Sequence, residues 1–288
     1  MMAAGISTVA IVGAGTMGQG IAEICAVSGF DVILFDINPD ILRQAAQRIN
    51  SDLSRLADKG KLSAKDTASA LSRISFPSEI QHVKADLIIE AVVEDLAVKQ
   101  NLFRELEANN SEDAILVSNT SSLSITRIGK ALRHPRRFAG LHFFNPAYVM
   151  NLVEIVEGPL TDSAIVGKLR GFCESLGKQA VLLKDSPGFI VNRVARLYYV
   201  EALKIAEEGI ADFATIDKLM RGAGFRMGPF ELMDLIGIDT NFAVTRSIYR
   251  AFYDEPKFRP SRIQQQKVDA GELGRKTGKG FYDYTAQK

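Results

Sequence analysis

The sequence predicts two domains, a doubly wound α/β sheet followed by an all-α domain. Apolar, β-branched runs alternate with amphipathic helical segments up to about residue 184, which is typical of a parallel sheet flanked by helices. This alternation stops at residues 185–188, and only helical patterns follow. The length of 288 residues agrees with two domains at roughly 150 residues each. We therefore expect domains at residues 1–186 and 187–288.

The amino-terminal segment has the pattern of a βαβ unit. Ile6–Val12 is a β-branched apolar run that ends at a glycine, as expected of a buried parallel strand. Thr16–Ser28 carries apolar residues at helical spacing, and Gly29 follows as a stop signal. A second apolar strand is expected at Asp31–Asp36.

The remaining elements follow from the same periodicities. Strands are expected at Asp86–Glu90, Ala114–Ser118, Arg137–His142, Leu152–Val156 and Ala180–Leu183. Helices are expected at Pro39–Gly60, Lys61–Ile74, Lys99–Ala108 and Thr161–Leu176, and in the second domain at Phe189–Glu207, Phe213–Ala223, Phe230–Ile236 and Asp239–Tyr253.

Composition excludes several classes of partner. With 35 Lys and Arg against 34 Asp and Glu, the net charge is +1, which favours neither nucleic acid nor an anionic membrane as a partner. Cys25 and Cys173 form no C-x-x-C motif, so no metal site is expected. The uncharged stretch Ala3–Ala22 is rich in glycine, and Arg43 is the first basic residue, so neither a spanning helix nor a secretory signal is indicated. We expect a cytoplasmic protein.

A glycine-rich turn joins the first strand to the first helix. Gly13, Gly15 and Gly18 match the G-x-G-x-x-G pattern in the strand–turn–helix context that gives it meaning. The glycines allow the tight turn, the approach of a pyrophosphate and close packing of helix on strand, and the helix N-terminus attracts phosphate. Thr16 and Met17 open that helix. We predict a Rossmann-type dinucleotide site, the alternative being a glycine-rich turn without a ligand.

Asp36 ends the second strand at about the offset where an acid binds the ribose 2′-hydroxyl of the cofactor. A carboxylate there repels a 2′-phosphate, so NAD is predicted rather than NADP. The alternative is that Asp36 caps the helix that begins at Pro39.

Three polar features interrupt the apolar pattern further along. A Ser/Thr/Asn-rich loop at residues 118–122 follows a strand, His142 ends another, and Glu154 interrupts a third. If the last two strands form a hairpin about Tyr148, His142 and Glu154 lie opposite each other, and the carboxylate can fix the imidazole tautomer. The alternatives are a polar loop with a helix cap, a structural core histidine and a solvent-exposed glutamate.

Several of these segments together resemble one family. They are SNTSS at 118–122, HFFNP at 142–146, Glu154, PGFIVNR at 187–193, GAG at 222–224 and MGPFEL at 227–232. The chain is similar, from Val9 to Tyr284, to the short-form L-3-hydroxyacyl-CoA dehydrogenases, especially the 3-hydroxybutyryl-CoA and 3-hydroxyadipyl-CoA dehydrogenases. The resemblance implies an NAD-dependent enzyme that acts on an acyl-CoA and forms a homodimer. Together with the balanced charge, we expect neither a nucleic-acid nor a membrane partner.

Residue by residue, the resemblance implies the following roles. His142 would be the catalytic base and Glu154 its partner, while Ser121 and Asn192 would hydrogen-bond the substrate. The positions that match cofactor contacts of the family, besides Asp36 and the glycine-rich turn, are Glu94, Lys99, Ser121, Asn145 and Lys276. Lys59 matches a basic residue that meets coenzyme A, although Asp52 stands where some members have Ser. Asn192 and His142 come from different domains, so the site is expected in the cleft between them.

Competing interpretations stay open at this point. The substrate is expected to be 3-hydroxybutyryl-CoA, with 3-hydroxyadipyl-CoA from aromatic catabolism as the alternative. β-Hydroxyacid dehydrogenases share the two-domain pattern, but they act on free acids and use a catalytic lysine. A third class is an NAD-binding protein that keeps the fold without activity.

Overall fold

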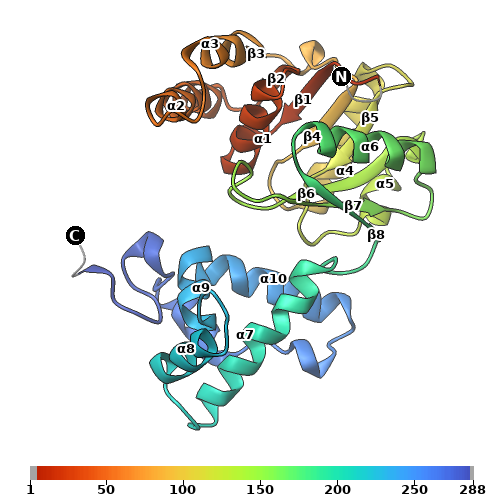
Figure 1. Ribbon diagram of the computed structural model, residues 1–288. Helices are drawn as coiled ribbons and strands as arrows, with labels where there is room; N and C mark the ends of the chain where they lie inside the picture. Colours follow the sequence, from red (N-terminus) through yellow and green to blue (C-terminus); the bar gives the residue numbers. More distant parts are fainter. Residues whose placement is uncertain (1–4, 286–288) are drawn as a thin grey trace. The chain divides into compact units, whose positions relative to one another are not determined.

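The computed structural model describes residues 5–285 of the chain. The chain divides into two compact units, the first ending at Asp185 and the second beginning at Ser186 (Figure 1). The boundary expected from the sequence lies one residue further along, between residues 186 and 187. Each unit has its own hydrophobic core and is described by itself.

The first unit is built on an eight-stranded sheet in the order β3-β2-β1-β4-β5-β6-β7-β8. The strands are β1 (Thr8–Val12), β2 (Asp31–Phe35), β3 (Ile74–Ser75), β4 (Leu87–Glu90), β5 (Ile115–Ser118), β6 (Phe138–Phe143), β7 (Leu152–Glu157) and β8 (Gln179–Lys184). Strands β1 to β6 pair in parallel, β7 is antiparallel to β6, and β8 is parallel to β7. The order 3-2-1-4-5-6 is that of the Rossmann fold. Successive strands are added to one side of β1 up to β3 and to its other side from β4 onward, so the switch point lies between β1 and β4.

Helices flank this sheet (Figure 1). They are α1 (Thr16–Val27), α2 (Pro39–Asp58), α3 (Ala64–Ser72), α4 (Leu96–Asn109), α5 (Ile125–Gly129) and α6 (Ser163–Ser175), with short 3-10 turns at Ile80–His82 and Pro135–Arg137. Local chemistry explains where α2 begins, because the Asn38 side chain accepts from the backbone N–H groups of Asp40 and Ile41 and Pro39 takes the first helical position. The same contacts show that Asn38, and not Asp36, caps this helix.

The central strands are buried along their whole length. β4, β5 and β6 have no exposed residue, as expected where helices cover both faces of a parallel sheet. Their interior residues are aliphatic, whereas each strand ends on or near a polar side chain at its carboxyl end. Glu90, Ser118 and His142 are these side chains, and all three are buried. Ligands of open α/β sheets bind at this edge, so the buried polar groups lie where function is expected.

The second unit is all helical apart from short turns. Its helices are α7 (Val191–Glu207), α8 (Phe213–Gly222), α9 (Pro229–Ile236), α10 (Ile238–Ala251) and α11 (Arg262–Asp269), with 3-10 turns at Pro256–Phe258 and Arg275–Thr277. Phe230 is fully buried at its centre, with the Phe213 and Phe281 rings 4.6 and 4.9 Å away. The buried Asp234 carboxylate accepts from the N–H groups of Phe281 and Tyr282, which ties the end of the described chain to this core.

The expected elements differ from the structure in a few places. α5 and α11 were not predicted, because α5 has only five residues and α11 buries only Gln264, so neither shows an apolar stripe. The helix expected at Lys61–Ile74 is shorter, and Ile74 instead begins the two-residue strand β3. Across residues 5–285, the structure contains no helix that is both long and apolar enough to cross a membrane.

Candidate active site

The glycine-rich turn has the geometry that a dinucleotide site requires. Gly13 has a φ of +109°, and a Cβ there would lie 2.5 Å from the carbonyl oxygen of Ala91. A Cβ on Gly18 would lie 1.8 Å from the carbonyl oxygen of Gly13, so helix and turn are in direct contact. Gly15 is different, because a Cβ there would meet no atom within 4 Å. Two glycines are thus required by the fold, and the third leaves open space.

That open space lies at the start of α1, whose cap residue Gly15 provides no side-chain hydrogen bond. The first N–H groups of a helix have no partner within the helix, and the helix dipole adds positive potential there. Backbone N–H groups without a side chain in front of them suit the pyrophosphate of a dinucleotide. Thr16 is exposed and Met17 is half-buried beside this space. The residues present therefore fit NAD at this position.

Asp36 directly follows β2, and its carboxylate is already oriented. One oxygen accepts from the backbone N–H of Ala14 at 2.9 Å, and the other accepts from the N–H of Asn38 at 2.9 Å. The first of these bonds ties the carboxylate to the glycine-rich turn. A carboxylate has further lone pairs, so it can still accept from a ribose hydroxyl.

His142 and Glu154 form a buried pair across two antiparallel strands. The register of β6 and β7 places the two residues directly opposite each other, as the hairpin hypothesis required. His142 Nδ1 lies 2.7 Å from Glu154 Oε2, and the carboxylate side chain is only 1% exposed. The solvent-exposed glutamate alternative is therefore wrong, and the catalytic role of His142 stays a prediction.

The turn between these strands is fixed from several sides. The Phe144 ring packs against the His142 ring with centroids 4.5 Å apart. The N–H of Phe143 donates to Asn119 Oδ1, which ties the end of β6 to the loop after β5. Lys178 donates to the carbonyl oxygens of Ala147 and Met150 at 2.7 and 3.0 Å. The backbone on both sides of His142 is thus held in place, while Phe144 and Glu154 contact the imidazole itself.

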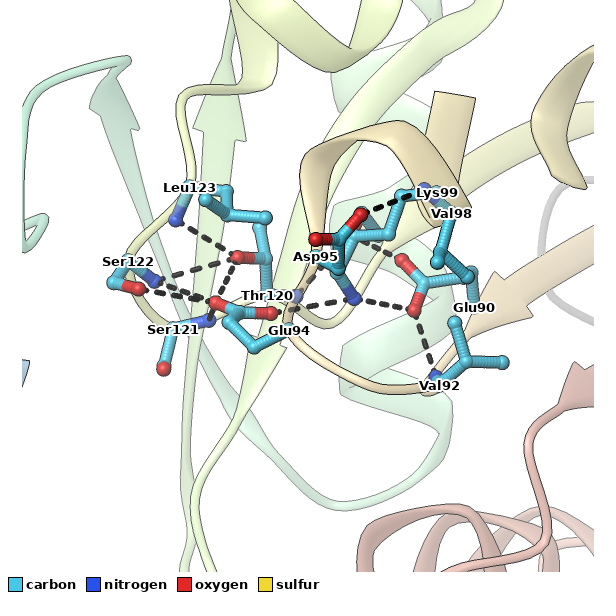
Figure 2. Close-up of polar contacts among 11 residues, drawn as sticks. Glu90, Val92, Glu94, Asp95, Val98, Lys99, Thr120, Ser121, Ser122 and Leu123 are labelled. Atoms are coloured by element: carbon cyan, nitrogen blue, oxygen red, sulfur yellow. Dashed lines mark hydrogen bonds and ion pairs between the residues drawn. The ribbon is translucent and has the colours of Figure 1, made fainter. Parts of the chain in front are cut away.

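The loops after β4 and β5 meet at the Glu94 carboxylate (Figure 2). Glu94 Oε1 accepts from Thr120 Oγ1 at 2.5 Å and from the N–H groups of Ser121 and Ser122 at 3.2 Å. Glu94 Oε2 lies 3.3 Å from Lys99 Nζ. In Figure 2 the Ser121 side chain points away from this carboxylate. Three predicted site residues, Glu94, Lys99 and Ser121, are thus brought together by one cluster of contacts.

The charge of Glu94 is stabilised inside this cluster. Burial acts to raise the pKa of Glu94, but the Lys99 ammonium and the hydrogen bonds from Thr120 and Ser122 outweigh it and hold that pKa below its usual range. Glu94 is therefore an anion at neutral pH, placed over the carboxyl ends of β4 and β5.

The predicted contacts near α1 and α2 line two neighbouring cavities. Thr16 and Asn145 line a cavity of about 180 Å³, and Lys59 lines a second one of about 220 Å³. Both cavities are also lined by Asp52 and Tyr148. The structure thus brings Asn145 beside the start of α1, while Lys59 lies at the far end of α2, where that helix ends.

Two predicted site residues belong to the second unit. Asn192 lies in the first turn of α7 and is half-buried. Lys276 pairs with Asp239 of the same unit, with Nζ 2.6 Å from the carboxylate. Their contacts to the cofactor and the substrate stay predictions.

Sequence reasoning missed Glu90, Ser118 and Thr120 as parts of the site. The signal for Glu90 is the one that drew attention to Glu154, a carboxylate joined to an apolar strand, where burial is costly without a partner. Thr120 stands within the polar loop that was noticed, but its bond to Glu94 depends on a contact between two loops that no local pattern shows.

Comparison with known proteins agrees with this geometry. Residues 8–186 match the NAD binding domain of 3-hydroxyacyl-CoA dehydrogenase, and residues 188–284 match its C-terminal domain. The chain belongs to the 3-hydroxyacyl-CoA dehydrogenase family. The family prediction, the fold class and NAD as cofactor are thereby confirmed.

Individual relatives of the family cover nearly all of this chain. A 3-hydroxyadipyl-CoA dehydrogenase of Escherichia coli is 47% identical over 285 residues, which are 98% of this chain but only 60% of that relative. The mitochondrial hydroxyacyl-coenzyme A dehydrogenase of Mus musculus is 41% identical over 97% of this chain and 91% of its own length. The crystal structure of an (S)-3-hydroxybutyryl-CoA dehydrogenase from Ralstonia eutropha superposes with a TM-score of 0.93 at 41% identity, covering 97% of this chain and 99% of that one.

Proposed function

We propose that the chain catalyses the NAD-dependent oxidation of a short-chain (S)-3-hydroxyacyl-CoA to the 3-oxoacyl-CoA, with His142 as general base. The observation that carries this proposal is the buried His142–Glu154 pair, with Nδ1 and Oε2 2.7 Å apart at the carboxyl end of β6 in a chain of this family. An imidazole oriented by a carboxylate is the arrangement that general-base catalysis uses.

The pair defines which nitrogen does the chemistry. A carboxylate only accepts hydrogen bonds, so the proton of the neutral imidazole is on Nδ1, the nitrogen that faces Glu154. Nε2 then has the lone pair that can accept the proton of the substrate 3-hydroxyl, and Glu154 stabilises the imidazolium that results. A bound NAD would supply the acceptor for the hydride of C3. In the reverse direction the same imidazolium returns the proton.

Two relatives and one cavity support a CoA thioester as the substrate. Both a 3-hydroxyadipyl-CoA and a 3-hydroxybutyryl-CoA dehydrogenase are close relatives, and both substrates are CoA thioesters. Arg55, Lys59 and Lys61 line the cavity of about 220 Å³ beside α2, which supports a site for the CoA phosphates. We propose 3-hydroxybutyryl-CoA as the preferred substrate, with 3-hydroxyadipyl-CoA as the alternative.

Steady-state kinetics tests the substrate. The purified chain is given NAD with the 3-hydroxybutyryl, 3-hydroxyhexanoyl and 3-hydroxyadipyl thioesters and with free 3-hydroxybutyrate, and NADH formation is followed by absorbance. We expect the highest kcat/KM with 3-hydroxybutyryl-CoA and no turnover of the free acid. A preference for the adipyl thioester would establish the alternative, and turnover of the free acid alone would contradict the proposal in favour of a β-hydroxyacid dehydrogenase.

A pair of histidine variants tests the base. His142→Gln should lower kcat by about 10²- to 10⁴-fold, the range that general-base catalysis contributes, while the affinity for NADH persists. His134→Gln is the matched control, because His134 is exposed. Turnover of His142→Gln close to that of the control would reject His142 as the base.

We also propose a cytoplasmic homodimer that forms through the helical unit. Leu219, Phe225, Leu235 and Ile236 of that unit are large apolar side chains, each at least 43% exposed, which supports a contact surface. Light scattering of the purified chain tests the dimer, and a monomer at micromolar concentration would contradict it.

A further inference from the structure

A buried ion pair lies beneath the loops of the candidate active site. Glu90 ends β4 with its side chain 0% exposed, and Lys99 of α4 is 1% exposed. Glu90 Oε1 accepts from Lys99 Nζ at 2.5 Å and from the N–H of Val92 at 2.7 Å, and Glu90 Oε2 accepts from Ser118 Oγ at 2.6 Å. One carboxylate thus joins the ends of β4 and β5 and the first turns of α4.

Lys99 lies between two carboxylates (Figure 2). Its Nζ is 2.5 Å from Glu90 Oε1 and 3.3 Å from Glu94 Oε2. Glu90 is sealed inside the fold, whereas the Glu94 side chain is 36% exposed. The two carboxylates and one ammonium form a chain of charges that runs from the core to the ligand-binding edge of the sheet.

Stability alone does not account for this arrangement. Removing charges from water costs several kcal/mol per ion, and a well-packed apolar pair of similar volume is often as stabilising as a buried ion pair. The position of the charges is informative instead. The β1–α1–β2 half of a Rossmann fold binds one nucleotide of the cofactor, so the carboxyl ends of β4 and β5 face the other nucleotide, which carries the nicotinamide.

We propose that Glu90 is a positioning residue for turnover, which acts through Lys99 and Ser118 to fix the Glu94 carboxylate and the loop 119–123 that carries Ser121. This inference rests on the proposed function, because Ser121 is the predicted substrate contact. Glu90 itself is buried, with its side chain 0% exposed. The contacts of Glu94 with Thr120, Ser121 and Ser122 transmit the position of the pair to the loop.

The same geometry gives Lys99 a further role. The contact near the cofactor that the resemblance implies stays a prediction, while the structure shows a side chain only 1% exposed whose Nζ lies 3.3 Å from Glu94 Oε2. Its ammonium acts as an internal counter-charge to Glu90 and Glu94 together. We infer that Lys99 also acts as a positioning residue, and Glu94 is the most exposed of the three charged side chains.

Two variants separate a positioning role from a merely structural one. Glu90→Gln leaves the Lys99 charge with Glu94 as its one carboxylate partner in the cluster, which draws the two together and displaces the loop. Misplacement by about 1 Å can cost about 10²-fold in rate, so we expect kcat/KM to fall by about 10²-fold together with a lower Tm. The double variant Glu90→Gln/Lys99→Met removes both charges, and its Tm should recover toward the wild-type value.

The double variant is the decisive one. Its Glu94 has no ammonium behind it, so kcat/KM should stay low even where the Tm has recovered. Without Lys99 the pKa of Glu94 should also rise toward its usual range. Glu157→Gln is the matched control, because Glu157 pairs with the exposed Lys184 on β8. This variant should change neither kcat/KM nor the Tm.

The affinity of the free enzyme for NADH, measured by fluorescence titration, gives a readout that needs no acyl-CoA. We expect both Glu90 variants to bind NADH about 10-fold more weakly, from displacement of the same loop. If the wild type turns over none of the thioesters, the proposed function fails, while the NADH titration still decides the role of Glu90. Wild-type NADH affinity and kcat/KM in the double variant would overturn the inference.

Discussion

The strands on the two sides of the switch point between β1 and β4 place different chemical groups at the same edge of the sheet. On the β1–β2 side the candidate contacts are backbone, a glycine-rich turn and a helix N-terminus, with Asp36 as the main charged group. On the β4–β7 side they are ionisable side chains: the buried pairs His142–Glu154 and Lys99–Glu90, and the partly exposed Glu94. The first side thus offers backbone groups and open space, which suit binding. The second side offers ionisable side chains, which suit catalysis.

This difference predicts that single changes have separate consequences on the two sides. Adding a side chain to a glycine on the β1–β2 side should alter the stability of the fold or its affinity for the cofactor. A change of charge at constant shape on the β4–β7 side should alter the rate. The largest effect is expected where charge and chemistry coincide.

Glu154→Gln tests the catalytic side with almost no change of shape. A neutral amide can still accept from Nδ1 of His142, but it no longer stabilises the imidazolium that forms when the base takes its proton. We expect kcat to fall by about 10²-fold or more, since replacing such a carboxylate by its amide is costly in catalytic pairs of this kind. Stopped-flow or steady-state NADH formation measures it.

Glu157→Gln, three residues along the same strand, is the matched control, because its partner Lys184 is exposed. A similar decrease of kcat in both variants would show that β7 responds to any loss of charge and that the His142–Glu154 pair has no special role.

Gly18→Ala and Gly15→Ala separate effects on stability from effects on cofactor affinity on the β1–β2 side. A methyl group on Gly18 would lie 1.8 Å from the carbonyl oxygen of Gly13, so we expect the free energy of unfolding to fall by about 3 kcal/mol. A methyl group on Gly15 meets no atom within 4 Å, and the φ of −72° suits alanine, so stability should change by less than about 0.5 kcal/mol. NADH affinity of Gly15→Ala should nevertheless fall by about 10-fold or more, because the methyl group occupies the space for the pyrophosphate.

Urea unfolding and NADH titration of the two variants provide the measurements. Unchanged NADH affinity in Gly15→Ala would place the pyrophosphate elsewhere and remove the distinction between the two sides.

What could be predicted from the sequence follows the same division. The glycine-rich turn is a local pattern, and its geometry follows from a few consecutive residues. His142 and Glu154 are twelve residues apart but share a hairpin, so alternation along two strands fixed their meeting. Both parts of the site were therefore within reach of spacing and periodicity.

The Glu90–Lys99–Glu94 cluster could not be predicted from spacing and periodicity. Glu94 and Lys99 entered only through resemblance to the family, and Glu90 was not singled out at all. The contacts of this cluster join the end of one strand, the first turn of a helix and a loop after another strand, so they depend on side-chain directions in three elements. Short or polar elements were missed for a related reason, since α5 and α11 bury too few apolar residues to produce a period.

One residue on the β1–β2 side departs from the comparison, and it gives the smallest effect. Glu23 of α1 is a buried carboxyl group, and burial together with the charge of Asp52 raises its pKa from 4.5 to about 7, against the opposing charges of Arg48 and Arg55. The folded state thus keeps a proton that the unfolded state releases at lower pH. Stability should fall as the pH rises from about 4.5 to about 7, because the unfolded state binds fewer protons in this window.

Glu23→Gln removes this titration and keeps the shape. At pH 4 the variant should match the wild type, and at pH 8 it should be more stable by up to about 2 kcal/mol, which urea unfolding at the two pH values measures. Glu208→Gln, at an exposed position on the second unit, is the control and should show no such difference. If the stability difference between the wild type and Glu23→Gln is the same at pH 8 as at pH 4, folding does not raise the pKa of Glu23. The β1–β2 side would then hold a carboxylate that ionises in the fold as readily as in the unfolded chain.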